Sequence, residues 1–359
     1  MTDADRNLEA QCSRRLSGHR YRAPAEALAA LATHPAAAEP ADLYGAGGAA
    51  SELERRTAEL LGKPAATFFI KGMIAQMSVL RVAAEQGRTL KVAIHPMSHI
   101  DLDEVGAAWR MHNLRPIRLG RYSPFTTADL DAVTEPTAAI VVELPLRRSG
   151  YLLPPIEELR AISAWARERG IHLHFDGARL WEAAAGYDVP LAELAALADS
   201  VYVSFYKGLG SLGGAVVAGE RSFVRSLAIW KTRHGGNLYR IYPYAISSLA
   251  GLDAHLPRMP EYVERARALA ERLSTERRVP ITPRTPDVNA FHLLLPGSVE
   301  ALTERNREFA RQRDVWVFNN FLESPVDGSS IGEIVIGDSS DDFPIEEAAG
   351  WIGDFLDLA

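Results

Sequence analysis

The sequence contains a single cysteine, Cys12, among its 359 residues. One cysteine cannot close an internal disulfide, and no cysteine and histidine pairs stand at zinc-finger spacings, so we expect neither a disulfide scaffold nor a metal site. This cysteine usage is typical of a reducing compartment. We therefore expect a cytoplasmic protein.

Long apolar runs and an excess of positive charge are missing as well. No uninterrupted apolar stretch approaches the roughly 18 residues that a membrane-spanning helix needs, and the N-terminal MTDADRNLEAQCSRR has no basic segment leading into an apolar one. The formal net charge of −7 provides no large positive field for binding nucleic acid. We expect a soluble protein that acts on a small molecule rather than on nucleic acid or a membrane.

Short apolar runs alternate with helical patterns over the first two thirds of the chain. The apolar runs cover residues 65–70, 89–95, 137–145, 171–178 and 200–208. Runs of this length between helices indicate parallel strands that are covered on both faces. We predict an α/β fold in which a large domain, residues 26–252, is built around a mainly parallel sheet.

The pattern changes after Leu252. A long helical segment near residues 260–278 leads to the proline-rich turn RVPITPRTPD, and strands and helices then follow in an order typical of a smaller α+β unit. We assign residues 253–359 to this C-terminal domain and residues 1–25 to an N-terminal arm. Two domains also agree with the usual size of about 100 to 200 residues per domain.

Lys207 follows the apolar run VYVSF and precedes the glycine-rich GLGSLGG. Ligands of open α/β sheets bind at the carboxyl ends of the strands, so this position lies where a site is expected. A desolvated lysine there can form a Schiff base with a carbonyl cofactor, although a lysine extending into solvent would show the same pattern. The hydroxyl of Ser204 is a candidate contact for a phosphate.

Asp176 follows HLHF, at the end of the preceding predicted strand. A buried carboxylate needs a cation or hydrogen-bond donors. Two partners fit: Arg179 in a structural ion pair, or the protonated pyridine nitrogen of pyridoxal phosphate, whose ring needs a carboxylate there to accept electrons. Asp176 and Lys207 lie one strand–helix–strand step apart, and together they are more specific than either alone.

Several longer motifs point to one family. HFDGARLWEA and SFYKGLGSLGGAVVAG occur in one chain with LYGAGGAASELERRTAELLGK, HPMSHIDLDEVGA and RHGGNLYR. In these motifs and their order the sequence resembles the threonine aldolase and β-eliminating lyase family of pyridoxal-phosphate enzymes, which have the fold type I architecture related to aspartate aminotransferase. The resemblance extends over most of the chain.

The resemblance implies a role for each matching residue at the cofactor ring. Lys207 would hold the cofactor covalently, and Asp176 would pair with the pyridine nitrogen. His99 matches the histidine that stacks on the ring and assists proton transfer, and Ala178 matches a small residue on the opposite ring face. Arg179 matches the arginine that binds the substrate carboxylate.

The resemblance also implies a phosphate site and an assembly. Gly72 and the backbone of Met73 match the phosphate-binding loop ahead of a helix N-terminus. Arg240 matches an arginine near the phosphate that can reach in from a neighbouring subunit. A homodimer or homotetramer is therefore implied.

The sequence departs from the family pattern at three places. The phosphate loop usually reads SGTMAN, whereas residues 71–76 read KGMIAQ, so two hydroxyls are missing and Lys71 is a candidate replacement. Leu144, Pro145 and Leu146 stand where the family has asparagine, threonine and histidine. Glu333 stands where the family has an arginine that assists carboxylate binding, so a cationic substrate group would be favoured there.

The N-terminal RRLSGHRYRAP stands where the family's substrate-contacting serine lies. It is interpreted either as part of the rim of the substrate pocket or as a basic arm in solvent. The candidate substrate-binding residues in it are Ser17, His19, Arg20 and Arg22.

The expected activity is that of a lyase. The resemblance implies cleavage of the Cα–Cβ bond of a β-hydroxy-α-amino acid to glycine and an aldehyde, with His99 or the released Lys207 as the base. Threonine-like and more specialised substrates both fit. The same scaffold supports a β-eliminase, a racemase or an aminotransferase, and the altered phosphate loop also leaves open a cofactor-free binding protein.

Overall fold

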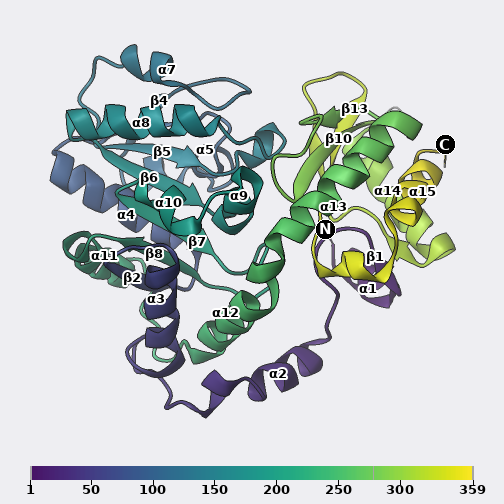
Figure 1. Ribbon diagram of the computed structural model, residues 1–359, viewed down its shortest axis with the longest axis horizontal. Helices are drawn as coiled ribbons and strands as arrows, with labels where there is room; N and C mark the ends of the chain where they lie inside the picture. The colour runs from purple at the N-terminus through teal and green to yellow at the C-terminus, as the bar shows by residue number, and fades with distance from the viewer. Residues whose placement is uncertain (1, 278, 358–359) are drawn as a thin grey trace. The chain divides into compact units, whose positions relative to one another are not determined.

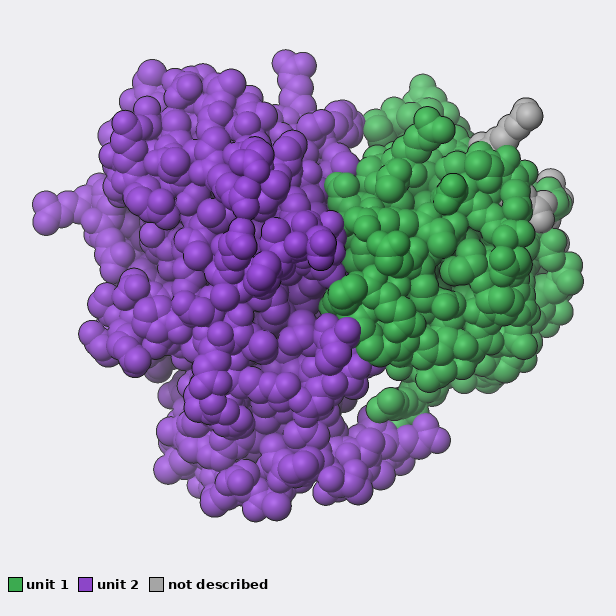
Figure 2. All heavy atoms as spheres, viewed as in Figure 1, with its two compact units in different colours: residues 1–23, 258–359 green, residues 24–257 purple. Residues whose placement is uncertain are grey.

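The computed structural model describes residues 2–277 and 279–357. They form two compact units, residues 24–257 and residues 1–23 together with 258–359 (Figure 2). The observed division after Pro257 lies a few residues beyond the expected one at 252. The N-terminal residues, which we expected to form a separate arm, instead belong to the same unit as the C-terminal part of the chain.

The unit of residues 24–257 contains a seven-stranded sheet with strand order β2-β8-β7-β6-β5-β3-β4 (Figure 1). Neighbouring strands from β4 to β7 are parallel, and β8 is antiparallel to both β7 and β2. The strands are β2 (Ala65–Phe69), β3 (Lys91–Ile94), β4 (Arg115–Arg118), β5 (Ala139–Glu143), β6 (His172–Gly177), β7 (Ser200–Ser204) and β8 (Ala215–Gly219). All residues of β5, β7 and β8 are buried, which explains their continuous apolar runs.

Helices surround this sheet. They are α2 (Pro24–Ala32), η1 (Pro35–Ala38), α3 (Gly48–Leu60), α4 (Gly72–Gly87), α5 (His99–Leu102), α6 (Ala107–Arg110), α7 (Thr127–Asp131), η2 (Arg147–Ser149), α8 (Ile156–Arg169), α9 (Leu180–Tyr187), α10 (Leu191–Ala196), α11 (Arg221–Arg233) and α12 (Tyr242–His255). Helix α4 contributes to two apolar clusters, one with β3 and β5 and one with β2, β7, β8 and α11. This packing fixes the N-terminus of α4 beside the carboxyl ends of the central strands.

The other unit has a four-stranded antiparallel sheet of order β12-β13-β10-β9 and a two-stranded parallel pair, β1 with β11. Its strands are β1 (Arg14–Arg15), β9 (Ile281–Thr282), β10 (Ala290–Pro296), β11 (Val315–Trp316), β12 (Phe321–Glu323) and β13 (Ser329–Val335). Its helices are α1 (Asp3–Gln11), α13 (Met259–Arg272), η4 (Leu273–Arg277), α14 (Val299–Arg313), η5 (Asp338–Asp342) and α15 (Ile345–Asp357), and η3 (Leu256–Arg258) spans the division.

The pairing of β1 with β11 explains why no separate arm forms. Leu16, which follows β1, is fully buried and its N–H donates to the carbonyl of Trp316. The predicted class, a large, mostly parallel α/β sheet with a smaller α+β part, is confirmed. Within the described residues, none of the helices has the length and apolar character needed to cross a bilayer.

Candidate active site

A cavity lies at the carboxyl ends of β5 and β6. It is lined by His99, Asp103, Glu143, Pro145, Arg147, Ala178, Arg179 and Lys207. Four of the residues expected from the sequence therefore meet at one place. They come from separate segments: the start of α5, the turn after β6 and the loop after β7.

Lys207 and Asp176 form the charged centre of this site. Burial lowers the pKa of Lys207 to about 8, and the positive guanidinium of Arg179 adds to this shift. Asp176, only 2% exposed, accepts the N–H of Ala178 at 3.3 Å. Burial raises the pKa of Asp176, while the positive charges of Lys207 and His99 oppose this. A lysine with a pKa near 8 has an appreciable neutral fraction at physiological pH, as an amine nucleophile requires.

Glu143, at the end of β5, is a site residue to which sequence reasoning gave no role. Its carboxylate accepts the N–H of His99 at 2.6 Å and the N–H of Arg147 at 3.1 Å. Burial raises the pKa of Glu143 to about 7, and the nearby charge of Asp176 adds to this shift. Glu143 therefore joins the first residue of α5 to the first residue of η2 and fixes two walls of the cavity.

His99 is held by a second buried carboxylate. Its Nδ1 lies 3.2 Å from Oε1 of Glu104, whose side chain is 1% exposed. The hydrogen bond to Glu104 raises the pKa of His99, and burial partly opposes the shift. Sequence reasoning missed Glu104, although its place five residues after His99 in HIDLDE was a usable signal.

Arg179 and Asp103 border the cavity with opposite charges. The guanidinium carbon of Arg179 lies 5.0 Å from the ring centroid of the buried Tyr151, so the ring supports it from one side. Asp103 is paired with Arg148. The ion pair between Asp176 and Arg179 that the sequence left open is not among the salt bridges of the described residues. Arg179 is thus a cationic group available at the cavity.

Gly72 is the first residue of α4, and Met73 beside it is partly exposed. A Cβ atom on Gly72 would lie 2.1 Å from the hydroxyl oxygen of Tyr202, which is too close for any side chain. Backbone N–H groups in the first turn of a helix have no acceptor within the helix, so this end of α4 is suited to an anion.

Two expected cofactor contacts have other partners. The hydroxyl of Ser204 is fully buried and donates to the carbonyl of Ala178 at 2.7 Å, so it ties β7 to the turn after β6. This corrects the expectation that Ser204 faces a phosphate. Arg240 is exposed, and its guanidinium donates to the carbonyl of Asp42 and lies 4.5 Å from the ring centroid of Tyr239. It is not among the residues that line the cavity.

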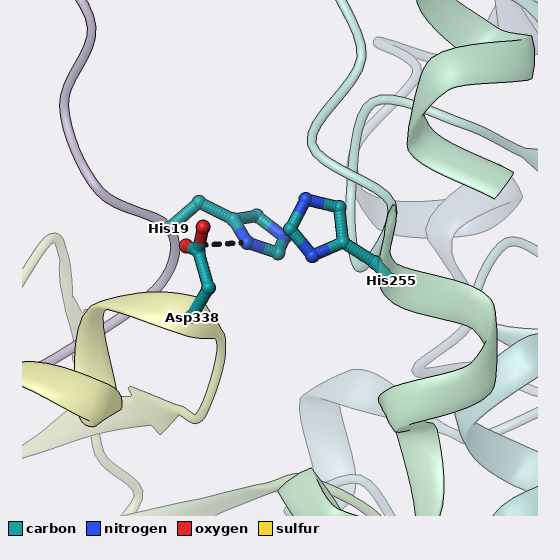
Figure 3. Close-up of side chains that lie close together, drawn as sticks. All are labelled: His19, His255 and Asp338. Carbon is teal, nitrogen blue, oxygen red and sulfur yellow. Dashed lines mark hydrogen bonds and ion pairs between the residues drawn. The ribbon is translucent and has the colours of Figure 1, made fainter. Parts of the chain in front are cut away.

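The expected substrate-rim residues lie in the unit that contains both termini. Ser17 accepts the N–H of Val335 at 2.9 Å through its hydroxyl. The guanidinium of Arg20 pairs with Asp342. Nδ1 of His19 lies 3.0 Å from Oδ1 of Asp338 (Figure 3). These contacts fold the N-terminal segment onto η5 and the end of β13.

Glu333 on β13 is buried. Its Oε1 lies 3.4 Å from Nε2 of His292, and its Oε2 accepts a hydrogen bond from Asn320 at 3.4 Å. Its substrate role stays a prediction, as do those of Ser17 and Arg20.

A family model described as beta-eliminating lyase matches residues 24–295. The chain belongs to the beta-eliminating lyase family. This family includes the relatives named as threonine aldolases, and the solved neighbours show that the architecture is fold type I.

Three relatives illustrate the similarity. An aldolase named vrtJ from Penicillium aethiopicum is 37% identical over 50% of this chain and 47% of its own length. A low-specificity L-threonine aldolase from Candida albicans is 30% identical over 58% of each chain. The chain thus spans about half the length of these curated relatives. A Listeria monocytogenes protein provisionally described as an L-allo-threonine aldolase is 33% identical over 98% of both chains, with a TM-score of 0.90.

Proposed function

We propose that this protein is a pyridoxal-phosphate-dependent lyase of the threonine aldolase type. It cleaves the Cα–Cβ bond of a β-hydroxy-α-amino acid, which yields glycine and an aldehyde. The observation that carries the proposal is the convergence of Lys207, His99 and Arg179 at one cavity, with the buried Asp176 near enough for its charge to act on Lys207. Membership of the beta-eliminating lyase family and similarity to relatives named as threonine aldolases support this choice of reaction.

The residues present fit the cofactor. The amine of Lys207, with its lowered pKa, is suited to hold an aldehyde covalently, and the buried Asp176 is suited to keep a pyridine nitrogen protonated. Ala178 is small and lines the cavity, so it leaves room for a flat ring. When bound, the cofactor supplies the electron sink that accepts the electron pair of the broken bond.

Arg179 and His99 act on the substrate. Arg179 binds the α-carboxylate and thereby sets which bond to Cα is held for cleavage. Because Glu104 contacts Nδ1 of His99, the Nε2 nitrogen is the one placed to accept the proton of the β-hydroxyl. The amine of Lys207, with its lowered pKa, would be the group that returns a proton to Cα.

An assay of the purified protein tests the reaction. We expect aldehyde release from threonine, allo-threonine or phenylserine, and loss of at least about 100-fold of that rate in Lys207→Ala, the scale of a lost general base or nucleophile. The family description makes β-elimination the second candidate. Keto-acid release from serine or cysteine, without aldehyde release from the hydroxy amino acids, would establish the eliminase and refute the aldolase.

The proposal includes a cytoplasmic homodimer or homotetramer. Support for assembly comes from a group of exposed apolar side chains near Arg240. Monomeric soluble proteins rarely expose a large contiguous apolar patch. Their exposed fractions are 50% for Leu43, 54% for Tyr44, 38% for Leu238, 58% for Tyr239 and 40% for Tyr242. Tyr44 and Tyr239 pack edge to face, with ring centroids 5.4 Å apart, so two of these segments adjoin.

Light scattering of the purified protein checks the assembly. We expect a mass of two or four chains, and a Tyr44→Ser/Tyr239→Ser double substitution should shift the population towards smaller species. Tyr122→Ser, at an equally exposed tyrosine elsewhere in the same unit, is the control. A wild-type protein that is monomeric and fully active would contradict the assembly and any role of Arg240 across an interface.

A further inference from the structure

The N-terminal turn of α4 has few side-chain donors for the cofactor phosphate. Residues 71–76, KGMIAQ, contain no serine or threonine, and the hydroxyl of Ser204 is committed to the carbonyl of Ala178. A phosphate dianion needs several donors and positive charge. Backbone N–H groups at the start of α4 supply part of this. Side chains near Gly72 are candidates for further donors.

Two tyrosines of one segment, Tyr202 on β7 and Tyr206 after it, place their side chains near this point. The hydroxyl of Tyr202 lies 2.1 Å from the position of a Cβ on Gly72, so it touches the first residue of α4. Tyr202 is 3% exposed, and a hydrogen bond joins its side chain to that of Tyr206. The N-terminus of α4 therefore faces hydroxyl groups that belong to a different element.

Tyr206 differs from Tyr202 in two ways. It is half-buried, so a ligand can reach it, and two ammonium groups lie near its ring. Nζ of Lys71 and Nζ of Lys207 each lie 6.0 Å from the centroid of its ring. Lys71 is the N-cap residue of α4 and is exposed, and its side chain makes no capping hydrogen bond. The positive charge of Lys71 and the phenol of Tyr206 thus lie close together near the N-terminus of α4.

The two tyrosines are both protonated at neutral pH. Burial raises the pKa of Tyr202 and of Tyr206 above the ordinary value of a phenol. A protonated phenol has one O–H to donate, so the half-buried Tyr206 can serve as a hydrogen-bond donor to an anion.

We propose that Tyr206 donates its hydroxyl proton to the phosphate of the cofactor, with Tyr202 fixing the phenol and Lys71 supplying charge. The two tyrosines and the lysine would replace the two hydroxyl groups that residues 71–76, at the start of α4, lack. The proposal rests on the cofactor assigned under the proposed function and deepens it, since it names the residues that recognise the phosphate.

A comparison of two ligands isolates the phosphate contact. Pyridoxal phosphate and pyridoxal, which lacks the phosphate, are titrated into the wild type, Tyr206→Phe and Lys71→Met, with binding followed by the visible absorbance of the bound ligand. Loss of one hydrogen bond to an anion should weaken pyridoxal phosphate about 10- to 100-fold in Tyr206→Phe. Loss of an exposed charge should weaken it up to about fivefold in Lys71→Met. Pyridoxal should bind all three proteins equally.

Controls separate a contact from a structural effect. Tyr122→Phe removes a hydroxyl from a tyrosine that is 59% exposed, and it should match the wild type with both ligands. Phosphorus NMR of the bound cofactor should show a changed titration of the phosphate in Tyr206→Phe. Lys71 is exposed, so Lys71→Met should fold even if a tyrosine variant does not.

Several outcomes would overturn the inference. Equal weakening of both ligands in Tyr206→Phe would mean that the phenol acts on the ring or the fold. Unchanged binding of pyridoxal phosphate would mean that the hydroxyl does not reach the phosphate. If the wild type binds both ligands equally, the phosphate is not recognised but the proposed function stands. If the wild type binds neither ligand, the proposed function fails as well.

Discussion

At the scale of single residues, the site depends on charges that have been removed from water. Three buried carboxylates, Asp176, Glu143 and Glu104, influence the same amine and imidazole. Each would be costly to bury alone, so each receives N–H donors or a cationic neighbour. Burial and the charge of Arg179 lower the pKa of Lys207 against the opposing charges of Asp176 and Glu143, whereas the hydrogen bond to Glu104 raises the pKa of His99. Both side chains line the site.

Glu104→Gln tests the coupling to His99. The hydrogen bond to Glu104 raises the pKa of His99, so loss of the carboxylate charge should lower that pKa. A base must be unprotonated, and the acidic limb of kcat/KM against pH should therefore move to lower pH. We also expect turnover to fall about tenfold, because the imidazole loses the partner that fixes its tautomer.

The pH profile of aldehyde release measures this effect. Glu59→Gln, on an exposed carboxylate of α3 that pairs with Arg55, should leave the profile unchanged. An acidic limb that stays in place in Glu104→Gln would show that His99 is not the group whose ionisation limits the rate.

At the scale of elements, β6 and β7 contain buried polar contacts in addition to the site residues at their carboxyl ends. His174 on β6 is fully buried, with Nδ1 2.8 Å from the hydroxyl oxygen of Ser200 on β7 and Nε2 2.9 Å from Oε1 of Gln76 on α4. Nε2 of His172 contacts the same Ser200 hydroxyl at 2.7 Å. These polar contacts hold α4 against the two strands whose ends form the site.

The buried histidines make stability sensitive to acid. Burial lowers the pKa of His174 to about 3 and that of His172 to about 4, whereas unfolded histidine has a pKa near 6.5. Between these values only the unfolded chain takes up the proton. Stability is therefore full above about pH 6.5 and falls as the pH drops towards 3, by about 1.4 kcal/mol per pH unit for each histidine.

Urea unfolding between pH 7 and pH 4 measures this loss. In His174→Gln, whose amide can still bond to Ser200 and Gln76, one of the two proton uptakes is removed. The slope of the unfolding free energy against pH should therefore be smaller than in the wild type by about 1.4 kcal/mol per unit. Parallel curves for the two proteins would exclude His174 as an acid-sensitive group.

At the scale of the whole molecule, the expected cofactor residues and the expected substrate-rim residues fall in different units. Lys207, Asp176 and His99 belong to residues 24–257, whereas Ser17 and Glu333 belong to the unit built from both ends of the chain. A ligand that binds the first group should stabilise that unit directly, because binding to the folded state alone shifts the unfolding equilibrium.

Pyridoxal phosphate should therefore raise the melting temperature. At a free concentration about 100 times its dissociation constant, the added stability is about 2.7 kcal/mol. For a unit of roughly 150 to 250 residues this corresponds to about 5–10 °C. Thermal unfolding followed by circular dichroism checks the shift, with Lys207→Ala as the comparison. A rise of the same size in Lys207→Ala would contradict covalent attachment at that lysine.

The sequence by itself determined the fold class, because the alternation of apolar runs and helices records burial on both faces of a parallel sheet. It also determined Lys207, Asp176, His99 and Arg179 as site candidates, since each stands in a family motif at or near a strand end. The tertiary structure decided what those residues touch. Glu143 and Glu104 reach the site through loops whose course depends on packing, and a sequence does not encode that course locally.

The N-terminal segment and Ser204 also have tertiary contacts that the sequence alone does not reveal. Pairing of β1 with β11 joins residues 301 positions apart, which no local pattern reveals, so the expected arm proved to be part of a unit. Ser204 and Tyr206 are two residues apart with similar hydroxyl chemistry. Only the folded chain shows that the first is buried against Ala178 while the second is half-buried near two lysines.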